Sequence, residues 1–373
     1  MPGTEASDNR PNAVFEELYD RIRSGALRAG SRLPSERQLA DEFGVSRSQI
    51  QMAIVQLSSA GLIDQVPNCR PVVRDRNSLQ RPRSTNRRNQ VALWIHPNVE
   101  DLGASTILKS IRAALGSAGF SAIIGCPDSP DEESEESFLR TLARSTSVAG
   151  AIVWTNGGNI GEAYNDLISS NIPVVFVDRE PTEEIRADVV STDNRRAAIT
   201  AVNHLVKLGH KNILAVLNNE RVSSVNDRYQ GYLQALSDAD LQLRCGPFTL
   251  PSGVNSAASE AADQLVKQLI ATQDRPSAIF AINDQIAMHL YDAVLENGYS
   301  VPKDFSIVGF DWFLRWVPSG GHITTVCQHF EEIGRIAVDR LLERIGRPEP
   351  FVPRHVLVDA PLVIKGSTGA YLA

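Results

Sequence analysis

The 373-residue sequence contains no apolar run of about 18 residues, the length that a transmembrane helix needs. Its first eleven residues are polar and lack the apolar core of a signal peptide, so we expect a cytoplasmic protein. Its four cysteines are widely spaced, and none forms a Cys-x-x-Cys pair or a zinc-type group with histidine. A P-loop and a nucleophile elbow are also missing. We therefore expect no membrane partner, no metal, no cofactor and no enzymatic activity.

Lysine is absent from residues 1–90, yet this part of the chain is basic. It holds fourteen arginines against ten acidic residues, a net charge of +4, whereas the whole chain carries −7 and the remainder therefore −11. A small basic segment joined to a larger acidic one predicts a polyanion-binding module on a different body. Residues 76–88 are rich in arginine and poor in apolar side chains. They predict a linker that either only solubilises the connection or also contacts phosphates.

The first module contains two capping boxes, in which a serine and a glutamine three residues later each bond the other's backbone N–H. They are Ser35 with Gln38 and Ser46 with Gln49. We expect a helix to begin after each serine, with Gly44 in the short turn between the two helices. An apolar stripe at helical spacing predicts another helix upstream. Its members are Val14, Leu18 and Ile22.

Two helices joined by a short glycine-containing turn are the signature of a helix-turn-helix. Two β-prone runs follow, at 62–66 and 71–73, and predict a hairpin or wing. The N-terminal end of the second helix of such a motif is where base edges and phosphates are reached. The apolar stripe of this helix leaves Arg47, Ser48, Gln51 and Met52 near its outward face. The pattern therefore predicts a DNA-binding module.

Residues 15–74 resemble the GntR-type winged-helix domain, with matching elements at 24–27, 30–40, 43–47 and 57–63. The resemblance implies that Arg37 and Arg47 contact DNA and that the wing tip enters the minor groove. Gln51 departs from the family pattern, in which arginine is commoner, and the wing tip at 68–71 lacks the usual glycines. The predicted DNA-binding set is Arg32, Ser35, Glu36, Arg37, Ser46, Arg47, Ser48, Gln51, Asn68 and Arg70.

From residue 90 onward, continuous apolar β-prone runs alternate with helical patterns. This alternation predicts parallel sheets covered by helices on both faces. About 280 residues exceed one compact core, so we expect two such sheets and therefore two lobes. Ligands of open α/β sheets bind beyond the carboxyl ends of the strands.

Polar side chains directly follow several of these strands, where they would converge on one cleft. They are His96, Asn98, Thr155, Asn156, Asp178, Arg179, Asn283, Asp284 and Asp311. Carboxylates, amides and arginine suit a hydroxylated ligand, because they form paired hydrogen bonds with neighbouring hydroxyls. Tryptophans can stack on a sugar ring. We expect Trp94 and Trp154, which lie within strands, in the core, and Trp312 and Trp316, in a loop region, as stacking candidates.

Almost all of residues 90–365 resemble the LacI-type sensor, which is related to periplasmic sugar-binding proteins. The similarity is carried by residues 172–179, 204–213, 227–232, 278–287, 301–311 and 324–328. It implies effector contacts from Arg228, Asn283, Asp311 and Gln328, and from N-lobe residues around His96, Asn98, Thr155 and Asn156. Trp312 departs from the family, in which acidic or small residues are commoner. A GntR-type head on this body resembles the arabinose-repressor-like regulators.

The sequence therefore predicts a multidomain fold, with an N-terminal winged helix-turn-helix and a two-lobed α/β periplasmic-binding-protein-like domain with parallel sheets. We expect a flexible terminus at 1–12, the winged helix at 13–75, the linker at 76–88 and the effector-binding and dimerisation domain at 89–373. The function would be transcription regulation, most simply repression. The partners would be a near-palindromic double-stranded DNA operator, a small-molecule effector of the sugar class, and a second copy of the chain.

Three points stay open at this level. The apolar stripe within residues 331–345 could face either the core or a partner. Asn156–Gly161, with Asp178 after the next strand, loosely matches a dinucleotide fingerprint and would suit a nicotinamide-dependent oxidoreductase, although the first glycine is missing. A freestanding solute-binding protein is a further alternative, but it would need a signal peptide and no DNA-binding head.

Overall fold

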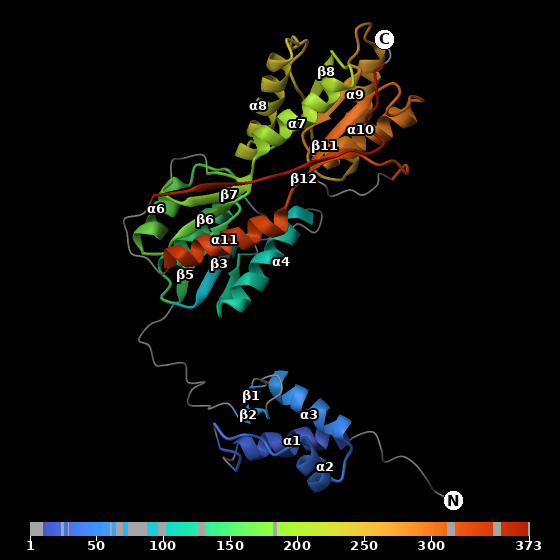
Figure 1. The fold of residues 1–373 in the computed structure, drawn as a ribbon. Helices are drawn as coiled ribbons and strands as arrows, with labels where there is room; N and C mark the ends of the chain where they lie inside the picture. Colours follow the sequence, from blue (N-terminus) through green and yellow to red (C-terminus); the bar gives the residue numbers. More distant parts are fainter. Residues whose placement is uncertain are drawn as a thin grey trace, which may run out of the picture. The chain divides into compact units, whose positions relative to one another are not determined.

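The computed structural model describes residues 10–23, 26–28, 30–59, 62–64, 70–73, 88–95, 102–125, 131–181, 185–311, 318–345 and 352–371. The chain divides into two compact units, Met1–Asn86 and Arg87–Ala373 (Figure 1). Several predicted site residues lie outside the described residues, together with residues 68–69 of the predicted wing tip and residues 76–87 of the predicted linker. They are Asn68, His96, Asn98 and Trp312.

The first unit, the head, contains α1 (Arg10–Arg23), α2 (Glu36–Phe43) and α3 (Arg47–Ser59), followed by the antiparallel pair β1 (Ile63–Asp64) and β2 (Val72–Val73). Both bonds of the capping box form at Ser35, and Gly44 ends α2 in the left-handed conformation at φ 63°. Glycine reaches this conformation without steric cost, which allows the tight turn into α3. The buried core includes Leu18, Leu39 and Ile54, one from each helix. The predicted winged helix-turn-helix is confirmed.

The first lobe of the second unit, the body, is built on a six-stranded parallel sheet with the order β13-β7-β6-β5-β3-β4. Its strands are β3 (Gln90–Trp94), β4 (Ser121–Ile124), β5 (Val148–Val153), β6 (Val174–Val177), β7 (Asp188–Thr192) and β13 (His355–Val358). Helices α4 (Leu102–Ser117) and α11 (Phe330–Ile345) share one apolar cluster with this sheet. Helices α5 (Glu132–Ala143) and α6 (Gly161–Ser169) share another.

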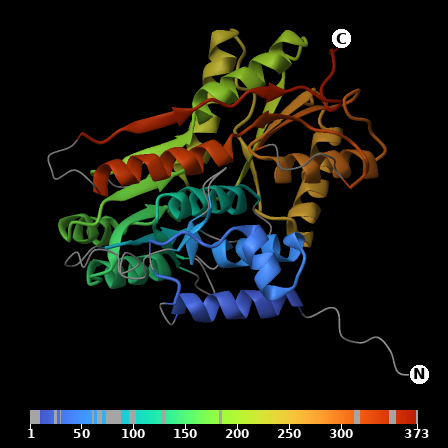
Figure 2. The ribbon, with the colours of Figure 1, turned by 60° about the horizontal axis from the view of Figure 1, so that its bottom comes forward.

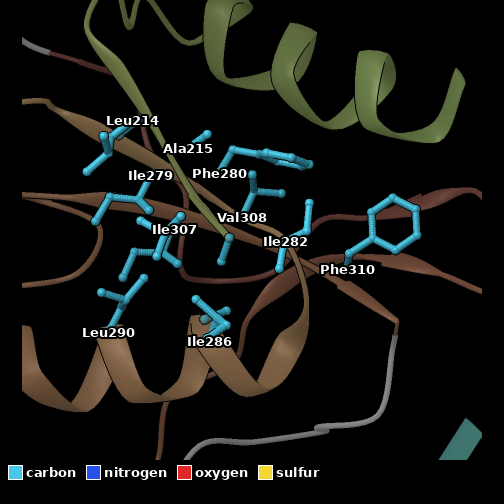
Figure 3. Close-up of a cluster of buried hydrophobic side chains, with 14 of the residues drawn as sticks. Leu214, Ala215, Ile279, Phe280, Ile282, Ile286, Leu290, Ile307, Val308 and Phe310 are labelled. Atoms are coloured by element: carbon cyan, nitrogen blue, oxygen red, sulfur yellow. The ribbon is translucent and has the colours of Figure 1, made fainter. Parts of the chain in front are cut away.

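The second lobe has a six-stranded sheet with the order β14-β12-β11-β10-β8-β9, parallel except for β14. Its strands are β8 (Ile213–Asn218), β9 (Phe248–Leu250), β10 (Ala278–Ala281), β11 (Ser306–Asp311), β12 (Thr324–Cys327) and β14 (Leu362–Val363). The helices are α7 (Asn194–Lys207), α8 (Ser223–Asp238), α9 (Ser256–Ala271) and α10 (Asp284–Glu296). In the core of this lobe, Ile286 and Leu290 of α10 lie against the strand residue Ile307 (Figure 3). The predicted two-sheet α/β body is confirmed.

The chain passes between the lobes after β7, after β12 and after β13, and the last passage is the long red segment of Figures 1 and 2. Hydrogen bonds join these crossovers to one another. The amide of Asp193 donates to the carbonyl of Val358 at 2.9 Å, and that of Cys327 donates to Pro361 at 2.8 Å. The Thr192 hydroxyl donates to the Gln328 side chain. The lobes are therefore joined by one compact hinge region.

The open question about residues 331–345 is settled by α11. Ile333, Ala337 and Leu341 are completely buried in the first lobe, and Ile336 and Ile345 pack against the same cluster. The stripe therefore faces the core and leaves no apolar face of α11 for a partner.

A buried carboxylate on β7 binds α11 to the first-lobe sheet. Asp188 of β7 lies 2.8 Å from Nη2 of Arg340 and 2.7 Å from Nη2 of Arg344, and it accepts the amide of Arg354 at 2.8 Å. Burial raises the pKa of this carboxyl, but the hydrogen bonds from Arg344, Arg354 and Arg340 outweigh burial and hold the pKa below its ordinary value. Asp188 therefore joins α11, β7 and β13 through its charge.

Asp188→Asn should lower the free energy of unfolding at pH 7 by about 3 kcal/mol, because it leaves two arginines without their buried counter-ion. A depressed folded-state pKa stabilises the fold above the unfolded-state value of about 3.9, and this contribution disappears as the pH falls through the folded-state pKa. Urea unfolding between pH 7 and pH 3 measures both effects. Asp339→Asn, which breaks an exposed pair with Arg335 on the same helix, is the control and should cost less than about 1 kcal/mol. Equal losses in the two variants would contradict the assignment.

Candidate functional site

The predicted DNA-binding residues of the head are helix caps or, with one exception, exposed side chains. Ser35 and Ser46 act as caps, since each accepts a backbone N–H from a glutamine that in turn binds the serine's own N–H. The side chains at the other described positions of the predicted set, apart from half-buried Glu36, are exposed. They are Arg32, Arg37, Arg47, Ser48, Gln51 and Arg70.

One contact fixes the orientation of a predicted base reader. Nε2 of Gln51 donates to Oε2 of Glu36 at 3.2 Å, which joins the second turn of α3 to the first turn of α2. One amide hydrogen of Gln51 is engaged by this bond, while its Oε1 and second hydrogen remain for other partners. Sequence reasoning named both residues but did not find their contact.

The second candidate site is a cleft in the body, beyond the carboxyl ends of strands from both sheets. It encloses about 510 Å³ when the open space at its mouth is counted. The described residues that line it come from both lobes. They are Trp154, Asp178, Arg179, Asn218, Glu220, Ser224, Val225, Arg228, Asn283, Gln285, Asp311, Gln328 and Phe330.

Arg228 of α8 is the central cation of the second-lobe wall. Its Nε donates to Oδ1 of Asn194 at 2.8 Å and its Nη1 to the carbonyl of Ile282 at 2.9 Å. Its Nη1 also lies 3.1 Å from Oδ1 of Asp311, and the guanidinium stands 3.9 Å from the ring centroid of Phe310. A planar cation held on several sides has little freedom, so Arg228 presents a fixed direction to a ligand.

Asp311 and Gln328 continue this network to the hinge. Nε2 of Gln328 donates to Oδ1 of Asp311 at 2.6 Å, while its Oε1 accepts the hydroxyl of Thr192 at the crossover after β7. Asp311 has φ 118°, a conformation that non-glycine residues rarely adopt. Such strain persists where the surroundings over-determine a residue, and it is common at ligand sites. The cleft and the hinge therefore share a polar chain.

The first-lobe wall reaches across to the second lobe. Nη2 of Arg179 lies 2.7 Å from Oε2 of Glu220, and the amide of Glu180 donates to the Ser223 hydroxyl at 2.7 Å. The Arg179 guanidinium also stands 5.4 Å from the ring centroid of Trp154. These two bonds, which we call the latch, join the loop after β6 to the start of α8. The latch is closed in this structure.

Among the described residues, Nε of Arg179 and Oδ1 of Asn218 are buried in the cleft without a hydrogen-bond partner. A buried polar atom without a partner is costly and needs an explanation. A ligand with hydroxyl groups offers both a donor and an acceptor. A polyhydroxylated ligand could therefore supply the hydrogen-bond partners that these two atoms lack among the described residues.

Of the predicted ligand residues within the described chain, the structure brings six to the cleft: Asp178, Arg179, Arg228, Asn283, Asp311 and Gln328. Asn283 also caps α10, since its Oδ1 accepts the amide of Ile286 at 2.9 Å. The other three line no part of it. Asp284 is fully buried and accepts the Thr325 hydroxyl at 2.6 Å. Thr155 and Asn156 belong to a loop in which the Thr155 hydroxyl accepts the amide of Gly157 and the amide of Asn156 donates to Glu135.

That loop also tests the oxidoreductase alternative. The amide of Asn156 donates to Oε2 of buried Glu135 at 2.9 Å, and burial raises the pKa of this carboxyl. A Cβ on Gly158 would lie 2.3 Å from Cδ of Glu132. Gly158 therefore faces an acidic side chain that would repel a pyrophosphate, and the amides of Asn156 and Gly157 already donate to Glu135 and to the Thr155 hydroxyl instead of being free for phosphate. The geometry gives the dinucleotide interpretation no support.

Several lining residues were missed from the sequence. Asn218 ends β8 and could have been found by the same strand-end rule as the others. Trp154 was expected in the core; it packs in the first-lobe cluster and lines the cleft as well. Glu220, Ser224 and Val225 surround the start of α8, where loop geometry and not a strand end places them.

Two family models match the chain. Residues 11–69 match the model of bacterial regulatory proteins of the gntR family, and residues 202–368 match the periplasmic binding protein-like domain. Together they cover the head and most of the body's second lobe and hinge. The chain thus combines a GntR-type helix-turn-helix with a periplasmic-binding-protein-like domain.

Known regulators are similar to this chain. The HTH-type transcriptional repressor CytR of Escherichia coli is 28% identical over 285 residues, 76% of this chain and 80% of the relative. The arabinose metabolism transcriptional repressor of Geobacillus stearothermophilus is 22% identical over 361 residues, 95% of this chain and 96% of the relative. The structure of a LacI family regulator from Enterococcus faecium with bound ribose is 25% identical, with a TM-score of 0.62, and covers 76% of this chain and 100% of its own.

The two modules define the class: the protein is a DNA-binding transcription regulator with a small-molecule effector domain. Its similarity to the arabinose repressor runs through both head and body, so the two modules occur in the same order there. None of the relatives named above is an enzyme. Among the helices that the structure describes, none has both the length and the apolar character needed to cross a membrane.

Removal of the Ser223 hydroxyl should loosen the latch. Ser223→Ala takes away the acceptor of the Glu180 amide, and one hydrogen bond contributes about 0.5–1.5 kcal/mol, so this amide should exchange about two- to tenfold faster. Hydrogen exchange of the ligand-free full chain, followed by mass spectrometry, measures it. Ser259→Ala, on the exposed surface of α9, is the control. Unchanged exchange at Glu180 in Ser223→Ala would show that the latch does not form.

Proposed function

We propose that the protein is a homodimeric repressor whose affinity for an operator is controlled by a sugar bound between the lobes of the body. The observation that carries this proposal is the cleft, where Arg228, Asp311 and Gln328 form one buried polar network beside the unfilled polar atoms of Arg179 and Asn218. Such a set can bind several neighbouring hydroxyls at once. The ribose bound to the LacI family regulator from Enterococcus faecium supports the same ligand class.

Each wall of the cleft would have its own role. Asp311 and Asn283 would accept and donate hydrogen bonds at adjacent hydroxyls, and Arg228 would hold the Asp311 carboxylate and the ligand in one plane. Trp154 and Phe330 offer apolar faces for the C–H side of a sugar ring. Arg179 would leave Glu220 and bind the ligand instead. Ligand binding would therefore replace this direct bond between the lobes with contacts that each lobe makes to the effector.

Coupling to DNA would pass through the hinge. Gln328 contacts Asp311 in the cleft and Thr192 at a crossover, so a ligand that shifts Asp311 also acts on the segment that orients the lobes. A change of lobe angle in a dimer would alter the spacing of its two heads. Two heads require two half-sites, so the operator would be a near-palindrome. Because its partner is the chromosome, we place the protein in the cytoplasm.

The ligand proposal is tested with the full-length chain and a panel of pentoses, hexoses and disaccharides. A sugar that raises the melting temperature is then titrated by calorimetry into the wild type, Asp311→Asn and Arg228→Ala. Hydrogen bonds to charged groups contribute about 1.5–3 kcal/mol, so each variant should bind about ten- to a hundredfold more weakly. Glu260→Gln, on the surface of α9, is the control. Wild-type affinity in both cleft variants would show that the sugar binds elsewhere, and no binding by any sugar would overturn the ligand class.

The DNA proposal is tested at the exposed end of α3. Arg47→Ala should weaken operator binding by about 1–3 kcal/mol if Arg47 contacts a base edge. Lost phosphate contacts would also reduce the dependence of affinity on salt, since fewer counterions are released. Fluorescence anisotropy at several salt concentrations measures both. Arg112→Ala, an exposed change on α4 of the body, should leave affinity unchanged. Equal affinity of Arg47→Ala and wild type would contradict the interface.

A further inference from the structure

Helix α3 has apolar side chains on two opposite faces. One face forms the core of the head with Ile50, Ile54 and Leu57, which are buried. On the other face, Met52 is 52% exposed and Val55 56% exposed. They are the exposed large hydrophobic side chains of the head within its described residues. Two exposed apolar side chains together on one short helix indicate that another molecule covers this face.

The position of this pair identifies the surface. Ser48, Gln51, Met52 and Val55 are spaced i, i+3, i+4 and i+7, so they form a single stripe along the helix. Arg47 lies beside the stripe at its N-terminal end. The exposed apolar pair is thus continuous with the residues proposed to read base edges, and Val55 lies about 12 Å along the axis from Arg47, about the width of the major groove.

We infer that Met52 and Val55 read thymine through its C5-methyl group in the major groove, next to an adenine contacted by Gln51. The methyl is the one apolar group that a base pair presents in this groove. Glu36 holds the Gln51 amide at 3.2 Å and leaves an oxygen and a hydrogen, the pair that matches N6 and N7 of adenine. Thymine is the partner base of adenine, so the stripe fits A·T pairs. This inference rests on the proposed function.

Charge favours DNA over a protein partner for this stripe. Arg47 is an exposed cation beside the N-terminal end of the stripe, and Arg37 is an exposed cation in the first turn of α2. A second head placed against the same face would bring like charges together. Duplex DNA instead offers phosphates to the arginines and methyl groups to the apolar pair in one docked position.

The test begins with selection of binding sites from a random duplex library by the full-length chain. Each thymidine of the selected half-site is then replaced by deoxyuridine, which removes only the methyl group and keeps every hydrogen bond of the base pair. Burial of one methyl-sized group corresponds to about a fourfold change in affinity. Wild type should therefore lose about fourfold at one or two thymidines. Met52→Ala or Val55→Ala should bind the unmodified site more weakly and lose nothing further at the same position.

Gln56→Ala, an exposed change on α3 outside the stripe, is the matched control and should keep the full methyl effect. A methyl effect that is equally large in wild type and in both stripe variants would overturn the inference, as would a half-site without thymidine or a site where deoxyuridine changes nothing. In each of these cases the chain still selects DNA, so the proposed function stands. A chain that enriches no sequence would overturn the proposed function and the inference with it.

Discussion

The proposed effector site depends on the buried ion pair between Arg228 and Asp311. An isolated charge at either position would be expensive so far from water, and each group is acceptable only because the other is 3.1 Å away. Asn194, the carbonyl of Ile282 and the Phe310 ring hold the arginine, while Gln328 holds the aspartate. The pair lies at the carboxyl ends of strands, in the place where a ligand of an open α/β sheet is expected.

The same ion pair is linked through Gln328 to the crossovers that join the two lobes. Gln328 stands at the crossover after β12 and contacts Thr192 at the crossover after β7. The latch from Arg179 and Glu180 to the start of α8 closes the opposite side of the cleft. A ligand that engages Asp311 and draws Arg179 from Glu220 would therefore act on both ends of the lobe interface. Differential contacts of this kind are what a ligand needs in order to shift a conformational equilibrium.

Much of this was predictable from the sequence, for identifiable reasons. Capping boxes are local, so Ser35 and Ser46 predicted the starts of α2 and α3, and both are found there. Strand-end polar residues were predictable because parallel strands end at one edge, which located Asp178, Asn283 and Asp311. Thr155 and Asn156 satisfied the same rule but do not line the cleft. The amide of Asn156 instead donates to the buried carboxylate of Glu135, whose position depends on tertiary packing. The latch was not predictable, because Arg179 and Glu220 are brought together only when two lobes meet. Neither was the bond between Glu36 and Gln51, which joins two helices across a turn.

The central claim is that the cleft and the operator are coupled, and linkage makes it testable by one paired measurement. Operator affinity is measured with and without the sugar that stabilises the protein, and sugar affinity is measured with and without operator. If both ligands bind one coupled protein, the two factors must be equal and different from one, with couplings of about 1–3 kcal/mol corresponding to about 5- to 150-fold. The account predicts that the sugar changes operator affinity and that operator changes sugar affinity by the same factor and in the same direction. A sugar that binds the cleft with the same affinity whether or not operator is present would contradict it.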